Sequence, residues 1–484
     1  MRAIATSLVC LGLAGAAALG CADRETVDAA PPRRVVLIVI DTLRADHLGV
    51  YGYEKETAPF LGRLAAMGTV FDRAHSTSSW TAPSTASIMT GLYPTRHGVV
   101  EGFFAHRQRE SRGAVEGHAV QPLARLPSDT RLLAERFADA GYRTFGAASN
   151  LNIGPALGFD RGFERFIDAQ NRPAEALLAQ VAAWPELHAD GDARSLLYLH
   201  LNDVHVPYEP RAPWYDTGAA GRGDDVAAYD SEIAYVDHHL AELAEQLGWN
   251  DDTLVVVVSD HGEEFGDHGG RRHDGGLHEE LTRVVMIFSG AGVPRARIDV
   301  DVSLVDVLPT LLELCGISAD DGALDGRSLT PLMSAWASGD IDVRDVFSDR
   351  PLLAHRAKMG REYGAHWWAI VLDGWKLIVD GDARALYDQR ADRRETDDRA
   401  AAEPERLRAL TEHLDALREG GIRRDGDRTE VTLDEEMLEA LESLGYVERP
   451  VEEPVEAPAE EPIEEPADRA EEAEASDTEH PDGE

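Results

Sequence analysis

Three apolar segments of the sequence run into side chains that can bind a metal ion or move a proton. The segments are VVLIVI (35–40), SLLYLHL (195–201) and TLVVVV (253–258). The side chains that follow them are Asp41, Asp203, His205, Asp260 and His261. Carboxylates and imidazoles together form a first coordination shell that suits a divalent cation. Each residue taken alone is more often a turn, capping or structural residue, so their coincidence at three segment ends is what favours a site.

These segments are continuous and rich in β-branched residues, as is typical of strands buried on both faces of a parallel sheet. Helical patterns lie between them, at 130–140 and at 229–247. This alternation predicts an α/β fold with a mainly parallel sheet sandwiched by helices. Ligands bind outside the carboxyl ends of the strands in such sheets, so we expect the polar side chains to meet at one edge.

The segment SSWTAPSTASIMTGLYPTRHG (78–98) adds a hydroxyl group. Pro83 fits the first position of a helix and Gly91 the position just past its end. Thr81 is then expected at the helix entrance, where backbone N–H groups and the helix dipole attract an anion. A Thr hydroxyl needs a base or a metal ion to become a nucleophile. Taken alone, Thr81 is better explained as an N-cap residue.

Several ordered motifs resemble the sulfatase branch of the alkaline-phosphatase superfamily, and they extend from about Val35 to Val447. They are VIDTLRADHLGVYGY, the 78–98 segment, NDVHVPY, SDHGEEFGDHG, LHEELTRV, VDVLPTLLELCGI and LYD. The resemblance implies the alkaline-phosphatase/sulfatase-like fold with a small C-terminal sheet-plus-helix subdomain. It also implies an ester hydrolase or group transferase that depends on a divalent metal ion, without distinguishing Zn, Mn, Ca and Mg.

The sequence departs from the sulfatases at the nucleophile. Sulfatases carry Cys or Ser followed by x-Pro-x-Arg, and the first residue becomes formylglycine. Here the segment is Thr81-Ala82-Pro83-Ser84-Thr85, so no formylglycine is expected. The first metal strand leads to Asp41-Thr42 in place of two Asp residues. The set that remains resembles the metal-plus-Thr site of the superfamily's phosphodiesterases and phosphoethanolamine or glycerophosphate transferases; it comprises Asp41, Thr81, Asp260 and His261.

The resemblance implies a role for each candidate residue. Thr81 is the nucleophile and a metal ligand beside Asp41, Asp260 and His261. His205 matches a family His that contacts the ester oxygen or protonates the leaving group.

Three further residues have roles that the resemblance leaves open. His273 could bind the substrate or complete a second metal site with Asp203. Asn150 could line the pocket or belong to a turn.

These observations favour an exported, metal-dependent hydrolase or transferase acting on phosphoric esters, in particular diesters, through Thr81. The substrate would be a small-molecule, lipid-head-group or glycan ester. One alternative is a sulfuric ester hydrolase, against which the missing formylglycine residue argues. The other is a non-catalytic envelope lipoprotein on a sulfatase scaffold, against which the retained metal set argues.

The net charge of −42 excludes a general affinity for nucleic acid, because an acidic surface repels phosphates. The cysteines, Cys10, Cys21 and Cys315, are too few and too dispersed for a disulfide framework. Residues 1–21 resemble a lipoprotein signal, and acylation of Cys21 would tether an exported protein to the cell envelope. Plain secretion and an uncleaved anchor are the alternatives.

The remaining chain divides by composition. Residues 22–33 form a linker, 34–340 the catalytic domain and 341–448 the small C-terminal subdomain. Residues 449–484 are an acidic, repetitive tail with too little apolar surface to fold.

Overall fold

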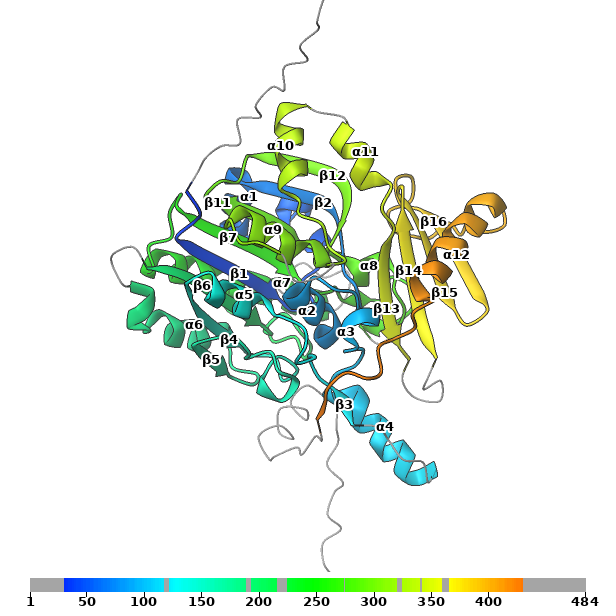
Figure 1. Ribbon diagram of the computed structural model, residues 1–484, viewed down its shortest axis with the longest axis horizontal. Helices are drawn as coiled ribbons and strands as arrows, with labels where there is room; N and C mark the ends of the chain where they lie inside the picture. Colours follow the sequence, from blue (N-terminus) through cyan, green and yellow to red (C-terminus); the bar gives the residue numbers. More distant parts are fainter. Residues whose placement is uncertain are drawn as a thin grey trace, which may run out of the picture.

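The computed structural model describes residues 30–116, 122–188, 193–215, 224–273, 275–319, 324–339, 342–358 and 365–429. Its centre is a nine-stranded sheet with the order β10-β2-β11-β7-β1-β6-β4-β5, to which β12 adds by pairing with β2 (Figure 1). The strands are β1 (Arg34–Ile40), β2 (Thr69–His75), β4 (Tyr142–Ala148), β5 (Arg165–Asp168), β6 (Arg194–Leu201), β7 (Thr253–Ser259), β10 (Arg283–Val284), β11 (Met286–Gly290) and β12 (Ala296–Ser303).

The strands at the middle of this sheet, β7, β1, β6 and β4, are parallel, whereas β11 is antiparallel to β7. Ile40 pairs with Ser259 on one side and with Leu201 on the other. The residues that follow these strands therefore leave the sheet side by side. This register brings Asp41 next to Asp260, as the sequence predicts.

Helices cover both faces of the sheet. One face packs against α2 (Thr81–Thr90), α5 (Leu133–Asp139), α9 (Val307–Leu314) and α10 (Thr330–Ser338). The other packs against α1 (Pro59–Met67), α6 (Ala174–Ala182) and α7 (Asp224–Gln246). Figure 1 shows α2 and α9 lying over the central strands.

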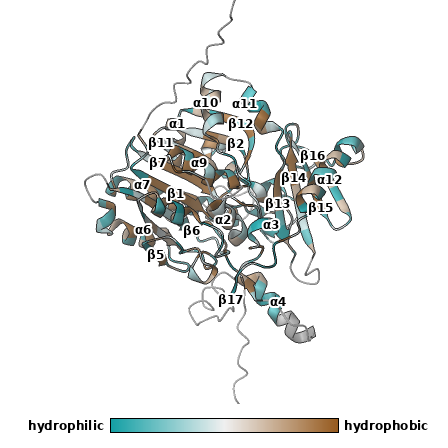
Figure 2. Cartoon of the chain, viewed as in Figure 1, coloured by the Kyte–Doolittle hydropathy of each residue, from teal (hydrophilic) through white to brown (hydrophobic). Residues whose placement is uncertain are grey.

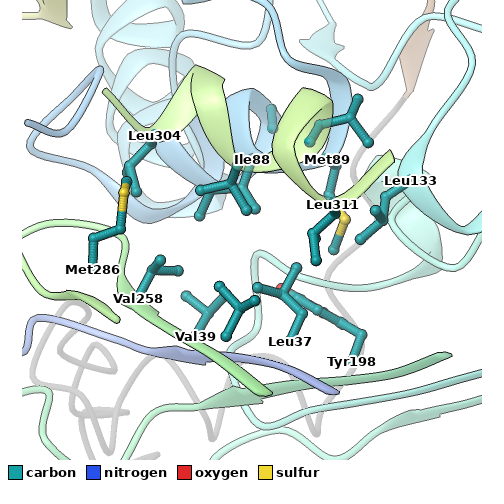
Figure 3. Close-up of a cluster of buried hydrophobic side chains, with 14 of the residues drawn as sticks. Leu37, Val39, Ile88, Met89, Leu133, Tyr198, Val258, Met286, Leu304 and Leu311 are labelled. Atoms are coloured by element: carbon teal, nitrogen blue, oxygen red, sulfur yellow. The ribbon is translucent and has the colours of Figure 1, made fainter. Parts of the chain in front are cut away.

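Alternation along β1 decides which way the site faces. Leu37 and Val39 belong to the core shared with α2, and Ile38 and Ile40 belong to the opposite core. Figure 3 shows Leu37 and Val39 facing the side chains of Ile88 and other residues of the helical layer. Because successive side chains of a strand point to opposite faces, Asp41 continues the row that faces α2.

A second, antiparallel sheet has the order β13-β14-β15-β16 and packs against α12 (Pro404–Arg418). Its strands are β13 (Leu352–Ala357), β14 (His366–Leu372), β15 (Trp375–Asp380) and β16 (Ala383–Asp388). The mainly parallel sheet between helices and the small C-terminal sheet with its helix confirm the expected fold class. Figure 2 shows the apolar colours concentrated in the central strands and hydrophilic colours on the outer helices.

Shorter elements complete the fold. They are α3 (Pro94–His97), α4 (Phe103–Glu116), α8 (Glu279–Thr282), α11 (Asp342–Ser348), and the strand pairs β3 (Leu123–Ala124) with β17 (Arg428–Thr429) and β8 (Glu264–Phe265) with β9 (Arg271–Arg272). Among the described residues, none of the helices combines the length and apolar character needed to cross a bilayer. The predicted leader with Cys21 and the acidic tail lie outside the described residues.

Helix α2 begins at Thr81 and ends at Thr90, and the following residue, Gly91, caps it in the left-handed conformation with a φ of 68°. Pro83 is therefore the third residue of α2, whereas the sequence pattern suggested that it was the first. The N–H groups of the first turn have no intrahelical acceptor, so proline costs no hydrogen bond there. Trp80 takes the N-cap position, and Thr81 is no cap.

Candidate active site

The carboxylates of Asp41 and Asp260 meet the imidazole of His261 in a fully buried cluster. Oδ1 of Asp41 and Oδ2 of Asp260 each lie 3.6 Å from Nε2 of His261. Neither oxygen has a hydrogen-bond partner. Nδ1 of His261 lies 2.9 Å from the carbonyl oxygen of Gly262, so Nδ1 carries the proton and Nε2 presents its lone pair to the two carboxylates.

The electrostatics of this pair favour a bound cation. Burial raises the pKa of Asp260 well above its ordinary value, and the charge of Asp41 adds to the rise. Burial also opposes ionisation of Asp41, but the hydrogen bond from His200 holds the pKa of Asp41 well below the usual range. Two adjacent buried carboxylates cannot both ionise without compensation. A divalent cation fits here, because it would satisfy both orphaned oxygens and the Nε2 lone pair together.

Thr81 lies at the edge of this cluster and is 6% exposed. Its hydroxyl oxygen is 3.2 Å from Nε2 of His261 and 3.4 Å from Oδ2 of Asp41. The loop before α2 is fixed by the hydroxyl of Ser76, which donates to the carbonyl oxygen of Asp260 at 2.5 Å. As the first residue of a ten-residue helix, Thr81 sits where the helix dipole is positive. The sequence-predicted set of Asp41, Thr81, Asp260 and His261 is thus brought together.

Thr42 occupies the position where the sulfatases in the resemblance carry a second aspartate. Its hydroxyl donates to the carbonyl oxygen of Val204 at 3.0 Å. Its N–H donates to Oδ1 of Asp260 at 3.3 Å, with φ at 54°. The side chain therefore braces the loop that follows β6 and offers no carboxylate to the cluster.

Two more imidazoles line the same site. The ring of His273 lies with its centroid 4.9 Å from that of His205 and 4.9 Å from that of His261. Nδ1 of His205 lies 2.7 Å from the carbonyl oxygen of Val206. Burial, together with the charge of His273, lowers the pKa of His205 to about 4. The structure places both predicted histidines beside the metal cluster.

Glu263 completes this side of the site and was not identified from the sequence. Oε1 of Glu263 is 3.2 Å from Nδ1 of His273, and the side chain is fully buried. Burial raises the pKa of Glu263 to about 7. A carboxylate behind an imidazole fixes the orientation of the ring, so Glu263 acts through His273.

Of the two remaining candidates, Asn150 belongs to the site and Asp203 does not. Asn150 donates from Nδ2 to Oδ2 of Asp41 at 2.6 Å, so it belongs to the site. Both carboxylate oxygens of Asp203 accept from the N–H of Ala174, at 3.0 and 3.1 Å, which caps the start of α6. The structure does not pair Asp203 with His273. The expectation that Asp203 and His273 could form a second metal site is therefore wrong. The first N–H groups of a helix have no intrahelical acceptor, and the Asp203 carboxylate accepts one of them.

His200 is a second residue that sequence reasoning missed. It lies on β6, is fully buried, and places Nε2 at 3.3 Å from Oδ2 of Asp41. One ligand atom each from Asp41, His200 and Asp260 lies within 4.8 Å of the others. The available signal was a titratable side chain inside the apolar run SLLYLHL, one residue before the end of a strand next to β1.

A family model described as Sulfatase matches residues 33–317, which contain every residue of this cluster. The chain belongs to the sulfatase family. It is 24% identical over 437 residues to N-acetylgalactosamine-6-sulfatase of Canis lupus familiaris, an alignment that covers 78% of this chain and 79% of that protein. Sulfatase-family proteins of this kind are ester hydrolases that depend on a metal ion.

Solved structures share the fold of this sulfatase-family chain. The structure of Ps i-CgsB in complex with k-i-k-neocarrahexaose has a TM-score of 0.66 at 20% identity, covering 86% of this chain and 98% of that one. The phosphonate monoester hydrolase of Agrobacterium radiobacter has a TM-score of 0.61 at 18% identity, covering 83% of this chain and 100% of that one. The fold therefore carries enzymes named for different esters.

Proposed function

We propose that this sulfatase-family hydrolase cleaves phosphoric esters, diesters in particular, with Thr81 as its nucleophile. The observation that carries the proposal is the position of the Thr81 hydroxyl, 3.2 Å from Nε2 of His261 and 3.4 Å from Oδ2 of Asp41 at the first residue of α2. It stands where the sulfatases of the resemblance carry the Cys or Ser that becomes formylglycine. Thr81 offers a plain hydroxyl there.

Asp41, Asp260 and His261 would hold the metal ion, with Thr81 as a fourth ligand. The orphaned Oδ1 of Asp41 and Oδ2 of Asp260 support this assignment. A bound divalent cation lowers the pKa of a coordinated hydroxyl and stabilises the negative charge of a phosphoryl group in the transition state.

The chain's own residues suggest two steps. Oγ1 of Thr81 attacks phosphorus as its proton passes to the imidazole of His205 or His273, the phosphorus–oxygen bond to the leaving alcohol breaks, and the same imidazole gives that proton to the alcohol. Water then attacks phosphorus and releases Thr81 with its proton restored. A formylglycine hydrate can release its ester by collapse of the diol, whereas a Thr ester must be displaced at phosphorus. This difference favours phosphoric over sulfuric esters.

We also propose export, with a lipid anchor at Cys21, on the strength of the apolar run that ends at this residue. The substrate would then be a small-molecule, lipid-head-group or glycan ester outside the cytoplasm. The glycan possibility draws on a fold neighbour solved in complex with k-i-k-neocarrahexaose. An acceptor alcohol in place of water would make the enzyme a transferase.

A panel of aryl esters tests the proposal on the full chain supplied with Mn²⁺ or Zn²⁺. Phosphate diester, phosphate monoester, phosphonate ester and sulfate ester would be compared for wild type, Thr81→Ala and Thr90→Ala. Thr90 lies at the far end of the same helix, where its hydroxyl donates to the carbonyl oxygen of Ala86 at 2.6 Å, so it is a matched control. We expect diester turnover that only Thr81→Ala abolishes. Sulfate turnover without phosphate turnover would contradict the proposal, and absence of both turnover and metal binding would favour a non-catalytic scaffold.

A further inference from the structure

The two carboxylate oxygens of Asp41 have contrasting surroundings. Oδ2 accepts from Nδ2 of Asn150 at 2.6 Å and lies 3.3 Å from Nε2 of His200 and 3.4 Å from the hydroxyl oxygen of Thr81. Oδ1, in the same carboxylate, has no hydrogen-bond partner. A carboxylate that is held through one oxygen has its rotation fixed, and its other oxygen is left for a ligand.

The position of His200 follows from the register of the sheet. His200 pairs with Val39 on β1, two residues before Asp41 and therefore on the same face of the sheet. It shares the face of Tyr198, two residues earlier on β6, and both side chains are fully buried. The imidazole therefore lies on the same face of the sheet as the Asp41 carboxylate, between that carboxylate and Tyr198 of the apolar core.

Tyr198 supports the other edge of this ring. Its hydroxyl lies 3.0 Å from Nδ1 of His200. Figure 3 shows the Tyr198 side chain beside Leu37 in the apolar core. The Asp41 carboxylate has only lone pairs to offer, so Nε2 of His200 must carry a proton. In the neutral ring Nδ1 is then an acceptor, and the Tyr198 hydroxyl donates to it.

We propose that Tyr198 and His200 are positioning residues that fix Asp41 as a one-oxygen metal ligand. The Tyr198 hydroxyl selects the His200 tautomer with its proton on Nε2, and this proton holds Oδ2 of Asp41 together with Asn150. Only Oδ1 then faces the cation. The proposal rests on the metal site of the proposed function but not on the identity of the ester.

The expected size of the effect follows from comparable outer contacts. Partners that orient a metal ligand are worth about 10- to 100-fold in metal affinity. His200→Leu should therefore weaken metal binding by about this factor. His200→Gln places an amide N–H near the position of Nε2 and should restore affinity to within a few-fold of wild type. Tyr198→Phe keeps the aromatic ring but removes the hydroxyl that selects the His200 tautomer. Its metal affinity should lie between those of His200→Gln and His200→Leu.

The test is a titration of metal-free full-length protein with Mn²⁺, followed calorimetrically, with no ester present. Tyr142→Phe is the matched control: Tyr142 is a buried tyrosine at the start of β4 whose hydroxyl donates to the carbonyl oxygen of Pro32 at 2.9 Å. It loses the same kind of hydrogen bond far from Asp41 along the strands. A thermal melt of each metal-free variant keeps folding defects separate from weakened binding.

The expected order of affinity is wild type and Tyr142→Phe, then His200→Gln, Tyr198→Phe and His200→Leu. If His200→Gln binds as weakly as His200→Leu, then His200 is itself a metal ligand and the positioning role is wrong. Equal affinity in all variants would also overturn it. Failure of wild type to bind any metal would instead refute the metal site of the proposed function.

Discussion

The hydroxyl oxygen of Thr81 lies 3.2 Å from Nε2 of His261. Thr81 is the first residue of a buried helix, and His261 follows the end of the central strand β7. Packing of α2 through Ile88 and Met89 against the sheet core fixes this distance (Figure 3). The hydroxyl thus shares a site with the orphaned carboxylate oxygens of Asp41 and Asp260. That arrangement places the hydroxyl, the proposed nucleophile, beside the groups that would hold an activating cation.

Thr81→Ala should reduce turnover at least about a thousandfold, because loss of a covalent nucleophile leaves only binding and charge stabilisation. Thr81→Ser keeps the hydroxyl and should retain most of the turnover, although its freer rotamer lowers the rate. Steady-state rates on an aryl phosphate diester would check both. Full activity in Thr81→Ala would mean that a bound water attacks the ester directly.

Asp260→Asn should stabilise the metal-free protein by about 1–3 kcal/mol, because it removes one of two adjacent buried carboxylates. An asparagine Oδ1 can still accept from the N–H groups of Thr42 and His261, which Oδ1 of Asp260 accepts at 3.3 and 2.8 Å. The variant should lose the rise in Tm that a bound cation gives wild type. Melting curves with chelator and with added Mn²⁺ provide both readings. A metal-dependent Tm rise that survives in Asp260→Asn would argue against the assigned ligand set.

Much of this site could be predicted from the sequence, because the neighbouring central strands end at the same level of the sheet. A continuous apolar run followed by Asp41, and another followed by Asp260 and His261, is enough to place three candidate ligands at one sheet edge. Asp203 follows its strand in the same manner, yet it caps α6, and nothing in its own segment reveals that distant helix end.

The position of His200 beside the candidate ligand Asp41 could not be inferred from where a strand ends. His200 lies inside an apolar run, where a single polar residue is usually a satisfied core group. Its role depends on the pairing of β6 with β1 and on the hydroxyl of Tyr198, which are tertiary facts. The start of α2 was misplaced for a related reason, because Pro83 is tolerated anywhere in the first turn.

The stability contribution of His268 should depend on pH. Nδ1 lies 2.8 Å from Oε1 of Glu280, and this hydrogen bond raises the pKa of His268 from 6.5 to about 9. Because the folded-state pKa is raised, the contribution is complete below about pH 6.5 and is lost as the pH rises through about 9. Urea unfolding of wild type and His268→Gln should differ most at pH 6 and converge above pH 9. His413→Gln, at an exposed position on α12, is the control; a difference independent of pH would contradict the charged state.

Lys376 should be a large contributor to stability where the small sheet meets the catalytic body. Its Nζ lies 3.0 Å from Oε1 of the buried Glu395 and donates to the hydroxyl of Thr282 at 2.9 Å. Lys376→Met leaves that carboxylate buried without its cation and should cost about 3–5 kcal/mol of unfolding free energy. Lys55→Met, which removes a half-exposed partner of Asp230, should cost less than about 1 kcal/mol. Chemical denaturation measures both unfolding free energies. Equal losses in the two variants would contradict the expectation that the buried ion pair contributes more.

The central claim is that a phosphoric ester is transferred to Thr81, and trapping that intermediate tests it most directly. The metal-supplied enzyme would be mixed with an aryl phosphate diester carrying ³²P, quenched in acid within one turnover, digested and analysed by mass spectrometry. The account predicts label on the peptide that contains Thr81, absent from Thr81→Ala and unchanged in Thr90→Ala. Turnover without label, or label on another side chain, would contradict it.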